Sequence, residues 1–160
     1  MKKILILLFL FLLVPVVRAE EEDLAPNAKS AIMIEASTGE ILFQKNKDEK
    51  LAPASMTKMM SMLLIMEEIE KGNLKWDEMI TASERAASMG GSQIFLKVGE
   101  KMSVTDMVKG ISIASGNDAT VAMAERISGS EESFVKKMND RAKELGLKNT
   151  NFINATGLTA

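Results

Sequence analysis

Apolar and polar residues divide the start of the chain into two short strand-like stretches. Residues 31–36 and 40–44 are rich in apolar side chains, and Ser37-Thr38-Gly39 separates them. Glycine readily takes the positive φ that a tight hairpin turn requires, so the pattern predicts an antiparallel β-hairpin. A charged loop over residues 45–50 follows the second stretch.

A helical period begins near residue 55. Pro53 fixes its own φ and favours extended geometry at Ala52, so a helix can begin close to Ser55. Apolar residues then recur at helical spacing until Gly72-Asn73 ends the segment, which predicts a central, buried helix. The apolar positions on which this prediction rests are Met59, Met62, Leu63, Met66 and Ile69.

Residues 73–100 show no regular period, and we expect loops and short helices there within the same domain. Ser103-Val104-Thr105-Asp106 fits a capping box that opens a helix ending near Ser115, and residues 118–127 form the next helix. Ser130 caps a further helix that ends before Gly146. Its expected solvated face consists of Glu131, Glu132, Lys136, Lys137, Asp140 and Lys143.

The first nineteen residues are typical of a signal peptide. Lys2 and Lys3 precede an apolar run over residues 4–17, and small residues follow, so we expect cleavage after Ala19. A retained membrane anchor is the alternative. However, at about 1.5 Å per residue the run spans roughly 21 Å, which is short of a hydrocarbon core of about 30 Å. An acidic leader over residues 20–27 comes next, and the protein is expected to act outside the cytoplasmic membrane.

Composition removes several chemistries. The chain contains no Cys, His or Tyr, which excludes a thiol nucleophile, a Ser-His-Asp triad, a tyrosine base and a Cys/His metal site. With 20 basic and 22 acidic residues and no basic run, nucleic-acid binding is not expected. The 13 methionines are typical of flexible core packing, so no metal or cofactor is predicted.

The candidate nucleophile is Ser55, in Ser55-Met56-Thr57-Lys58. Without histidine, a serine needs another base, and a lysine three residues along a helix lies on the same face. Burial and the positive end of the helix dipole both disfavour the ammonium form of Lys58. A capping serine followed by a solvated lysine would give the same pattern, so further motifs are needed.

Ser115-Gly116-Asn117 is the second motif. A hydroxyl and a carboxamide two residues apart on a tight turn between helices can point into one cleft. The tripeptide is common in turns, but here it lies sixty residues after Ser55 with helices between them.

Together these motifs resemble those of serine D-alanyl-D-alanine carboxypeptidases, low-molecular-mass penicillin-binding proteins related in fold to class A β-lactamases. The resemblance extends over residues 28–160. Besides the two motifs, it rests on the flanking segments 36–40, 51–54, 90–92 and 152–158. It implies an α+β fold of the β-lactamase/transpeptidase type, with a helical subdomain and an incomplete antiparallel sheet.

The resemblance also implies roles for the motif residues. Ser55 attacks the carbonyl between two D-alanines of a peptidoglycan stem peptide, and Lys58 accepts its proton. Ser115 relays a proton to the leaving amine, while Asn117 binds the substrate amide and helps to orient Lys58. The backbone N–H of Ser55 supplies one oxyanion donor. β-Lactams are expected to acylate the same serine, and no metal or cofactor takes part.

The third family motif, Lys-Thr-Gly, does not occur in these 160 residues. In the family it lies on a strand downstream of this stretch, so we expect a truncated catalytic domain over residues 28–160. That domain would have an unpaired sheet edge and no stable penicillin binding by itself. A C-terminal region beyond residue 160 would allow peripheral membrane association.

Three alternatives remain. A class A-like β-lactamase would carry a deacylating glutamate in a loop, whereas Glu131, Glu132 and Glu144 fall on a predicted helix. A non-catalytic cell-wall or penicillin-binding module would bind the stem peptide without releasing D-alanine. A signal-anchored structural protein would keep its first nineteen residues.

Overall fold

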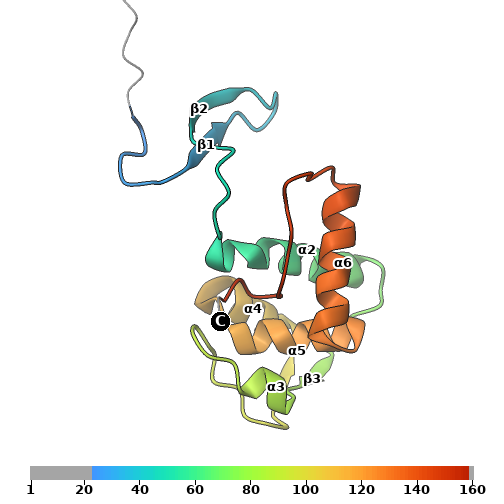
Figure 1. Ribbon diagram of the computed structural model, residues 1–160. Coiled ribbons are helices and arrows are strands. Elements are labelled where there is room, and N and C mark those ends of the chain that lie inside the picture. Colours follow the sequence, from blue (N-terminus) through green and yellow to red (C-terminus); the bar gives the residue numbers. More distant parts are fainter. Residues whose placement is uncertain (1–22, 159–160) are drawn as a thin grey trace, which may run out of the picture. The chain divides into compact units, whose positions relative to one another are not determined.

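The computed structural model describes residues 23–158, which fall into two compact units that divide after Lys50 (Figure 1). The expected signal peptide, residues 1–19, lies outside the described residues. Between residues 23 and 158, no helix is both long enough and apolar enough to cross a membrane.

The first unit contains the predicted hairpin. Strands β1 (Ala31–Ile34) and β2 (Ile41–Lys45) pair antiparallel, with a shift in register after Met33. The turn is organised by Glu35, whose carboxylate accepts hydrogen bonds from the backbone and hydroxyl groups of Ser37 and Thr38. These bonds, those of Thr38 first, lower the pKa of Glu35 to about 2. Gly39 has the expected positive φ of 75°.

The second unit, from Leu51 onwards, is mainly helical. It contains a 3-10 helix η1 (Ala54–Thr57) followed directly by α2 (Lys58–Glu70). The remaining elements are β3 (Met79–Thr81), α3 (Glu84–Ala87), β4 (Lys101–Ser103), α4 (Val104–Ala114), α5 (Asn117–Ser128) and α6 (Glu131–Glu144). Strands β3 and β4 pair antiparallel, so the stretch predicted as loops and short helices also supplies a strand.

The caps of the later helices agree with the sequence. Ser103 Oγ accepts the N–H of Asp106 at the start of α4, and Ser130 Oγ accepts the N–H of Ser133 at the start of α6. Each bond satisfies one of the backbone donors that a helix N-terminus leaves unpaired. The predicted boundaries of these helices are therefore confirmed to within a few residues.

The core lies around α5 rather than around α2. Every residue from Asn117 to Ala124 is buried, and Val121 and Met123 are fully enclosed. A second cluster joins α2 to α6 through Leu64, Phe134 and Met138. Burial of such side chains contributes about 1.5–3 kcal/mol each, so these contacts hold the helices together.

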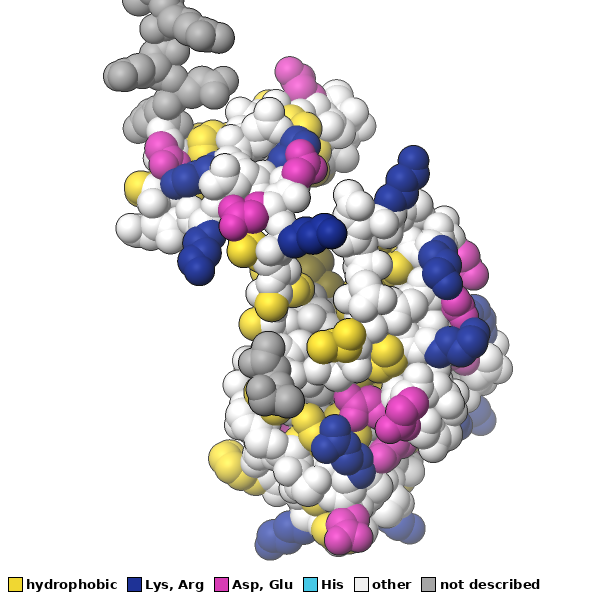
Figure 2. Space-filling view, viewed as in Figure 1, with side chains coloured by type: hydrophobic (Ala, Val, Ile, Leu, Met, Phe, Trp, Pro, Cys, Tyr) yellow, Lys and Arg dark blue, Asp and Glu magenta, His cyan; other side chains and the backbone are white. Residues whose placement is uncertain are grey.

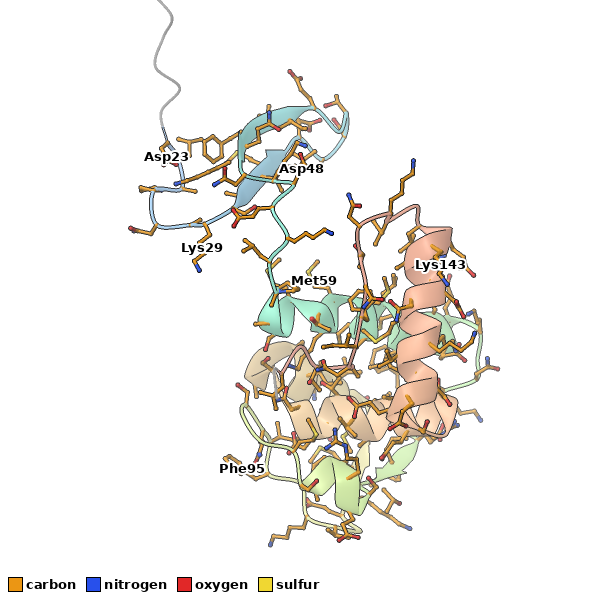
Figure 3. All side chains as sticks on the ribbon, in the orientation of Figure 1. Asp23, Lys29, Asp48, Met59, Phe95 and Lys143 are labelled. Carbon is orange, nitrogen blue, oxygen red and sulfur yellow. The ribbon has the colours of Figure 1, made fainter. Side chains whose placement is uncertain are left out.

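The predicted buried face of α2 is wrong. Met59 is 71% exposed and visible at the first turn of the helix (Figure 3), whereas Met60, Leu64 and Ile65 are buried. Met62, Met66 and Ile69 are only partly buried against the core. Apolar residues occur on every side of this helix, so their spacing does not identify the face that packs.

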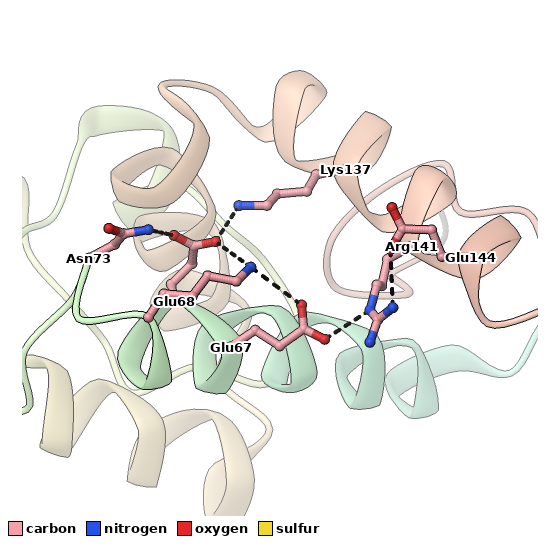
Figure 4. Close-up of polar contacts among 7 residues, drawn as sticks. Glu67, Glu68, Asn73, Lys137, Arg141 and Glu144 are labelled. Carbon is pink, nitrogen blue, oxygen red and sulfur yellow. Dashed lines mark hydrogen bonds and ion pairs between the residues drawn. The ribbon is translucent and has the colours of Figure 1, made fainter.

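Ion pairs connect the C-terminal half of α2 to α6 (Figure 4). Lys137 Nζ lies 2.7 Å from Glu68 Oε1, and Arg141 Nε lies 2.8 Å from Glu67 Oε1. Lys71 is 3.5 Å from Glu68. The hydrogen bond from Lys137, followed by that from Asn73, lowers the pKa of Glu68 to about 2. We call these residues, together with Glu144, the α2–α6 ion network.

The prediction that Glu131 lies on the solvated face of α6 is also wrong. Glu131 is 8% exposed, because it is the first residue of α6 and packs against the segment that follows the helix. Of the other residues expected on this face, Glu132, Lys136 and Lys143 are exposed, whereas Lys137 and Asp140 are half-buried. Over this helix Figure 2 shows Lys and Arg interspersed with Asp and Glu, as expected for a solvated helix face.

Candidate active site

Ser55 and Lys58 lie together at the junction of η1 and α2. Ser55 is exposed on η1, whereas Lys58, the first residue of α2, is 5% exposed. Lys58 Nζ lies 3.2 Å from Ser55 Oγ, within hydrogen-bond distance. The i, i+3 spacing therefore brings an accessible hydroxyl next to a buried amine, as the sequence predicted.

Lys58 has no carboxylate within ion-pair distance among residues 23–158. Its other hydrogen bond goes to the carbonyl of Thr156, at 2.9 Å. Burial lowers the pKa of the Lys58 ammonium, because the surrounding protein replaces water that would stabilise the charge. An amine that loses its proton more easily can act as a base.

The approach to Ser55 is tightly constrained. Ala54 has a positive φ of 48°, which a non-glycine residue rarely adopts. Gly157 packs directly on the Ala54 carbonyl, where a Cβ would collide, and its own φ is 75°. Glycine at 157 is therefore required for segment 154–158 to lie against the start of η1.

The second motif lies between α4 and α5. Ser115 caps α4 with a φ of 56°, and Asn117 is the first residue of α5. Asn117 is 2% exposed, and its side-chain N–H donates to the Gly90 carbonyl at 2.7 Å. Its backbone N–H donates to the Ser92 carbonyl at 2.8 Å. The loop over residues 90–92 therefore sets the orientation of the carboxamide.

Within the described part of the chain, two polar atoms of this motif lack hydrogen-bond partners. Ser115 Oγ and Asn117 Oδ1 are both buried, and no described residue bonds to them. An unsatisfied buried polar atom costs about 1–3 kcal/mol. Such atoms are typical of sites that bind a ligand, and both belong to the tripeptide selected from the sequence.

The two motifs share a neighbourhood. A Cβ on Gly91 would lie 2.9 Å from the Asn117 amide nitrogen and 3.2 Å from a methyl of Leu158. Leu158 belongs to the segment whose Thr156 carbonyl binds Lys58. No hydrogen bond joins Asn117 to Lys58 in the described residues, so the groups that orient the lysine here are Ser55 and Thr156.

Asp118 supports the loop beside the second motif. Its buried carboxylate accepts the backbone N–H groups of Ile94 at 3.1 Å and Leu96 at 3.0 Å, and it also accepts the N–H of Ala119. Between them, Phe95 has a φ of 62° and projects into solvent (Figure 3). The carboxylate thus holds a strained stretch of loop next to Asn117.

Ser61, Thr156 and Asp118 also contribute to this region, although none was predicted as a site residue from the sequence. Ser61 continues the i, i+3 spacing from Ser55 and Lys58, and this repeat was available as a signal. Thr156 acts through its backbone carbonyl, which no residue type reveals. Among residues 23–158, no group of His, Cys, Asp and Glu is arranged to hold a metal ion.

An exposed serine beside a buried lysine without an acidic partner, as seen among residues 23–158, is the arrangement that serine acyl-transfer enzymes with a lysine base use. Comparison with known protein families shows which family the chain belongs to. The model of the peptidase S11 family, D-alanyl-D-alanine carboxypeptidases, matches residues 16–160. The chain belongs to this family.

Curated relatives and solved structures support the same family membership. D-alanyl-D-alanine carboxypeptidase DacF of Bacillus subtilis is 67% identical over 137 residues, covering 86% of this chain and 35% of that protein. DacC of Escherichia coli is 41% identical over 161 residues, covering 95% and 40%. The crystal structure of DacD from Francisella tularensis gives a TM-score of 0.81 at 46% identity, covering 84% and 32%.

Penicillin binding protein 5 of Haemophilus influenzae gives a TM-score of 0.80 at 38% identity, covering 83% of this chain and 40% of that one. These likenesses confirm the predicted α+β fold of the penicillin-binding type. The chain spans less than half the length of each of these relatives.

Proposed function

We propose that the protein is a serine D-Ala-D-Ala carboxypeptidase, which removes the terminal D-alanine of peptidoglycan stem peptides through an acyl-enzyme. The observation that carries this proposal is the Ser55–Lys58 pair, 3.2 Å apart, with the amine buried and without a carboxylate partner among residues 23–158. Membership of the D-alanyl-D-alanine carboxypeptidase family supplies the substrate class.

Acylation begins at Ser55. Neutral Lys58 accepts the hydroxyl proton while Oγ forms a bond to the carbonyl carbon between the two D-alanines. The N–H of Ser55 lies in the first turn of η1, where intrahelical acceptors are lacking, and can donate to the developing oxyanion. The C–N bond then breaks, and the proton held by Lys58 passes through the Ser115 hydroxyl to the departing D-alanine amine.

Deacylation returns the enzyme to its starting state. A water molecule gives a proton to Lys58 and attacks the ester carbonyl, and Ser55 leaves as the alkoxide. The proton on Lys58 then restores the Ser55 hydroxyl. Lys58 therefore acts as the base in both acylation and deacylation. It must be neutral for this role, and burial helps because it lowers the pKa of the ammonium group.

Asn117 is the proposed substrate-binding residue. Its Oδ1 is a buried acceptor without a partner among residues 23–158, so an amide N–H of the peptide can bond there without replacing a bond to any of these residues. The bond from its Nδ2 to the Gly90 carbonyl keeps Oδ1 in one orientation. A preformed acceptor costs less conformational entropy on binding.

The same site would take β-lactams, whose strained amide presents a carbonyl to Ser55. Penicillin-Binding Protein D2 of Listeria monocytogenes, solved in the ampicillin-bound form, has a TM-score of 0.73 and 29% identity to this chain. We place residues 28–160 in the catalytic domain. Export through residues 1–19 would bring the enzyme to the outer face of the cytoplasmic membrane, with peripheral membrane association through a C-terminal region.

The test is acylation of the full-length gene product by a fluorescent penicillin, with D-alanine release measured from a D-Ala-D-Ala peptide. Labelling of Ser55 and release of D-alanine are expected, and Ser55→Ala removes both. Ser112→Ala, which alters an exposed serine of α4, is the matched control and should label normally. Rapid β-lactam turnover would indicate a β-lactamase instead, and peptide binding without D-alanine release would indicate a non-catalytic module.

A further inference from the structure

Segment 154–158 is held in a defined shape by its own side chains. Asn154 Oδ1 accepts the backbone N–H groups of Thr156 at 3.2 Å and Gly157 at 2.6 Å. Thr156 Oγ1 accepts the N–H of Leu158 at 3.1 Å. Ala155 and Thr156 are almost completely buried. These bonds form a compact turn that runs back against α2 after α6 (Figure 1).

Two consecutive carbonyls of this turn accept hydrogen bonds from one face of α2. Ser61 Oγ donates to the Ala155 carbonyl at 2.6 Å, and Lys58 Nζ donates to the Thr156 carbonyl at 2.9 Å. Ser61 is fully buried and lies three residues after Lys58, so the two side chains share a helix face. Ser61 thus binds the peptide group that immediately precedes the acceptor of the lysine.

Glu131 binds the same residue from the other side. Its Oε1 accepts the N–H of Ala155 at 3.2 Å, while its Oε2 accepts from Arg85, 3.0 Å away. Glu131 therefore fixes the peptide plane before Ala155 and Ser61 fixes the plane after it. Together these bonds hold the peptide groups on both sides of Ala155 and so fix where Thr156 lies. The Thr156 carbonyl shares its peptide plane with the Gly157 N–H, which Asn154 Oδ1 accepts, so its direction is then also set.

We infer that Ser61 and Glu131 are positioning residues that act on Lys58 through the Ala155–Thr156 backbone. This inference rests on the proposed function, in which Lys58 is the base. A neutral amine has two N–H groups and one lone pair. When the Thr156 carbonyl takes one N–H, the lone pair can turn towards the Ser55 hydroxyl. A displaced carbonyl would release the amine and admit water beside it.

The charged groups near segment 154–158 do not act on Lys58 through a direct ion pair. Glu131 bonds to the Ala155 N–H and pairs with Arg85, and it makes no ion pair with Lys58 among residues 23–158. Glu67 and Glu68 belong to the α2–α6 ion network, where basic residues pair with them. Within residues 23–158, a direct ion pair to Lys58 is absent, so the action of Glu131 passes through the backbone.

Asn139 offers a matched control in the same stretch of chain. Its side chain donates to the Phe152 carbonyl at 2.8 Å and accepts the Phe152 N–H at 2.8 Å. Like Glu131, it anchors the chain after α6 to α6 itself, but three residues before Ala155. Asn139→Ala therefore removes a comparable anchor without touching the peptide planes beside Lys58.

The experiment measures penicillin acylation of the full-length gene product against pH, separating non-covalent binding from the acylation step. Ser61→Ala and Glu131→Ala should lower the acylation rate constant by about tenfold to a hundredfold, the usual cost of slight misplacement of a catalytic group. The dissociation constant should stay the same. The acidic limb of the profile should move to higher pH, because water beside Lys58 stabilises the ammonium form.

Conservative variants keep the inference falsifiable if the alanine variants fold poorly. Ser61→Thr retains the hydroxyl donor and Glu131→Gln retains an oxygen for the Ala155 N–H, so both should restore most of the rate and the original pH limb. An equal shift in Asn139→Ala would overturn the inference, as would unchanged profiles in Ser61→Ala and Glu131→Ala.

A second readout separates this inference from the proposed function. The titration of the Lys58 Nζ resonance by NMR reports the environment of the amine whether or not the protein reacts with penicillin. Wild-type protein without acylation would contradict the proposed function alone. An Nζ titration that is the same in wild type, Ser61→Ala and Glu131→Ala would contradict the positioning role alone.

Discussion

At its first residue, α2 buries Lys58 without a carboxylate partner among residues 23–158, whereas its C-terminal half places Glu67 and Glu68 beside Lys71, Lys137 and Arg141. A buried charge without a counter-charge destabilises a fold, and an ion pair or hydrogen bond offsets that cost. One helix thus carries a buried amine without a counter-charge at its first residue and paired anions in its C-terminal half. The difference fits the role as base that we propose for Lys58 and a stabilising role for the α2–α6 ion network.

The sharpest way to test this contrast is Lys58→Met, which keeps an unbranched side chain of nearly the same length and removes the amine. Loss of a general base should lower penicillin acylation of Ser55 by about 10²- to 10⁴-fold. The thermal unfolding midpoint should not fall, because the variant removes a buried amine that has no counter-charge among residues 23–158. Acylation kinetics and calorimetry on one preparation measure both effects. Near-normal acylation would remove Lys58 from the mechanism.

Lys137→Met is the matching variant for the α2–α6 ion network. Lys137 belongs to α6 and pairs with Glu68 in the C-terminal half of α2. It leaves Glu68 with Lys71 and Asn73 only, and the free energy of unfolding should fall by about 1 kcal/mol, since Lys137 is partly solvated. Acylation should keep its wild-type rate constant. Denaturant unfolding gives the first quantity. A loss of activity at unchanged stability would reverse the roles assigned to the two ends.

The α2–α6 ion network also predicts an acid-dependent stability. Hydrogen bonds from Lys137 and Asn73 lower the pKa of Glu68 from 4.5 to about 2 in the folded protein. The stabilisation is therefore complete above the unfolded pKa and is lost as pH falls from about 4.5 towards about 2. Glu68→Gln should flatten the stability profile in that window. Identical acid profiles for the two proteins would show that Glu68 titrates normally.

The smallest effect is expected at the rim of the network. Glu144 lies 3.1 Å from Arg141, but most of its side chain is exposed. Because exposed helix pairs contribute little, Glu144→Ala should change the free energy of unfolding by about 0.5 kcal/mol or less. A change as large as that of Lys137→Met would show that the contribution of an ion pair to the free energy of unfolding does not depend on how buried the pair is.

Much of the fold and of the candidate site was predictable because the relevant signals are local. Gly39 marks the hairpin turn, Ser103 and Ser130 cap their helices, and the i, i+3 spacing places Ser55 beside Lys58. Each of these features depends on a few residues that are neighbours in the sequence, and each pattern usually forms the same local structure.

What could not be predicted depends on contacts distant in the sequence. The packed side of α2 is set by Phe134 and Met138 of α6, so the spacing of its own apolar residues was insufficient. Glu131 looked solvated because its partner, the Ala155 N–H, is a backbone group that follows the helix. The hydrogen bond from Lys58 to the Thr156 carbonyl was likewise not predictable, because every residue type has a backbone carbonyl.

The most direct test of the central claim is the titration of Lys58 itself. With lysine labelled at Nζ and Lys58→Met used to assign the resonance, NMR follows the amine across alkaline pH. We predict a Lys58 pKa below the ordinary value of 10.5, because burial disfavours the ammonium form. A pKa at or above 10.5 would show a fully charged lysine at neutral pH and would contradict its assignment as the base for Ser55.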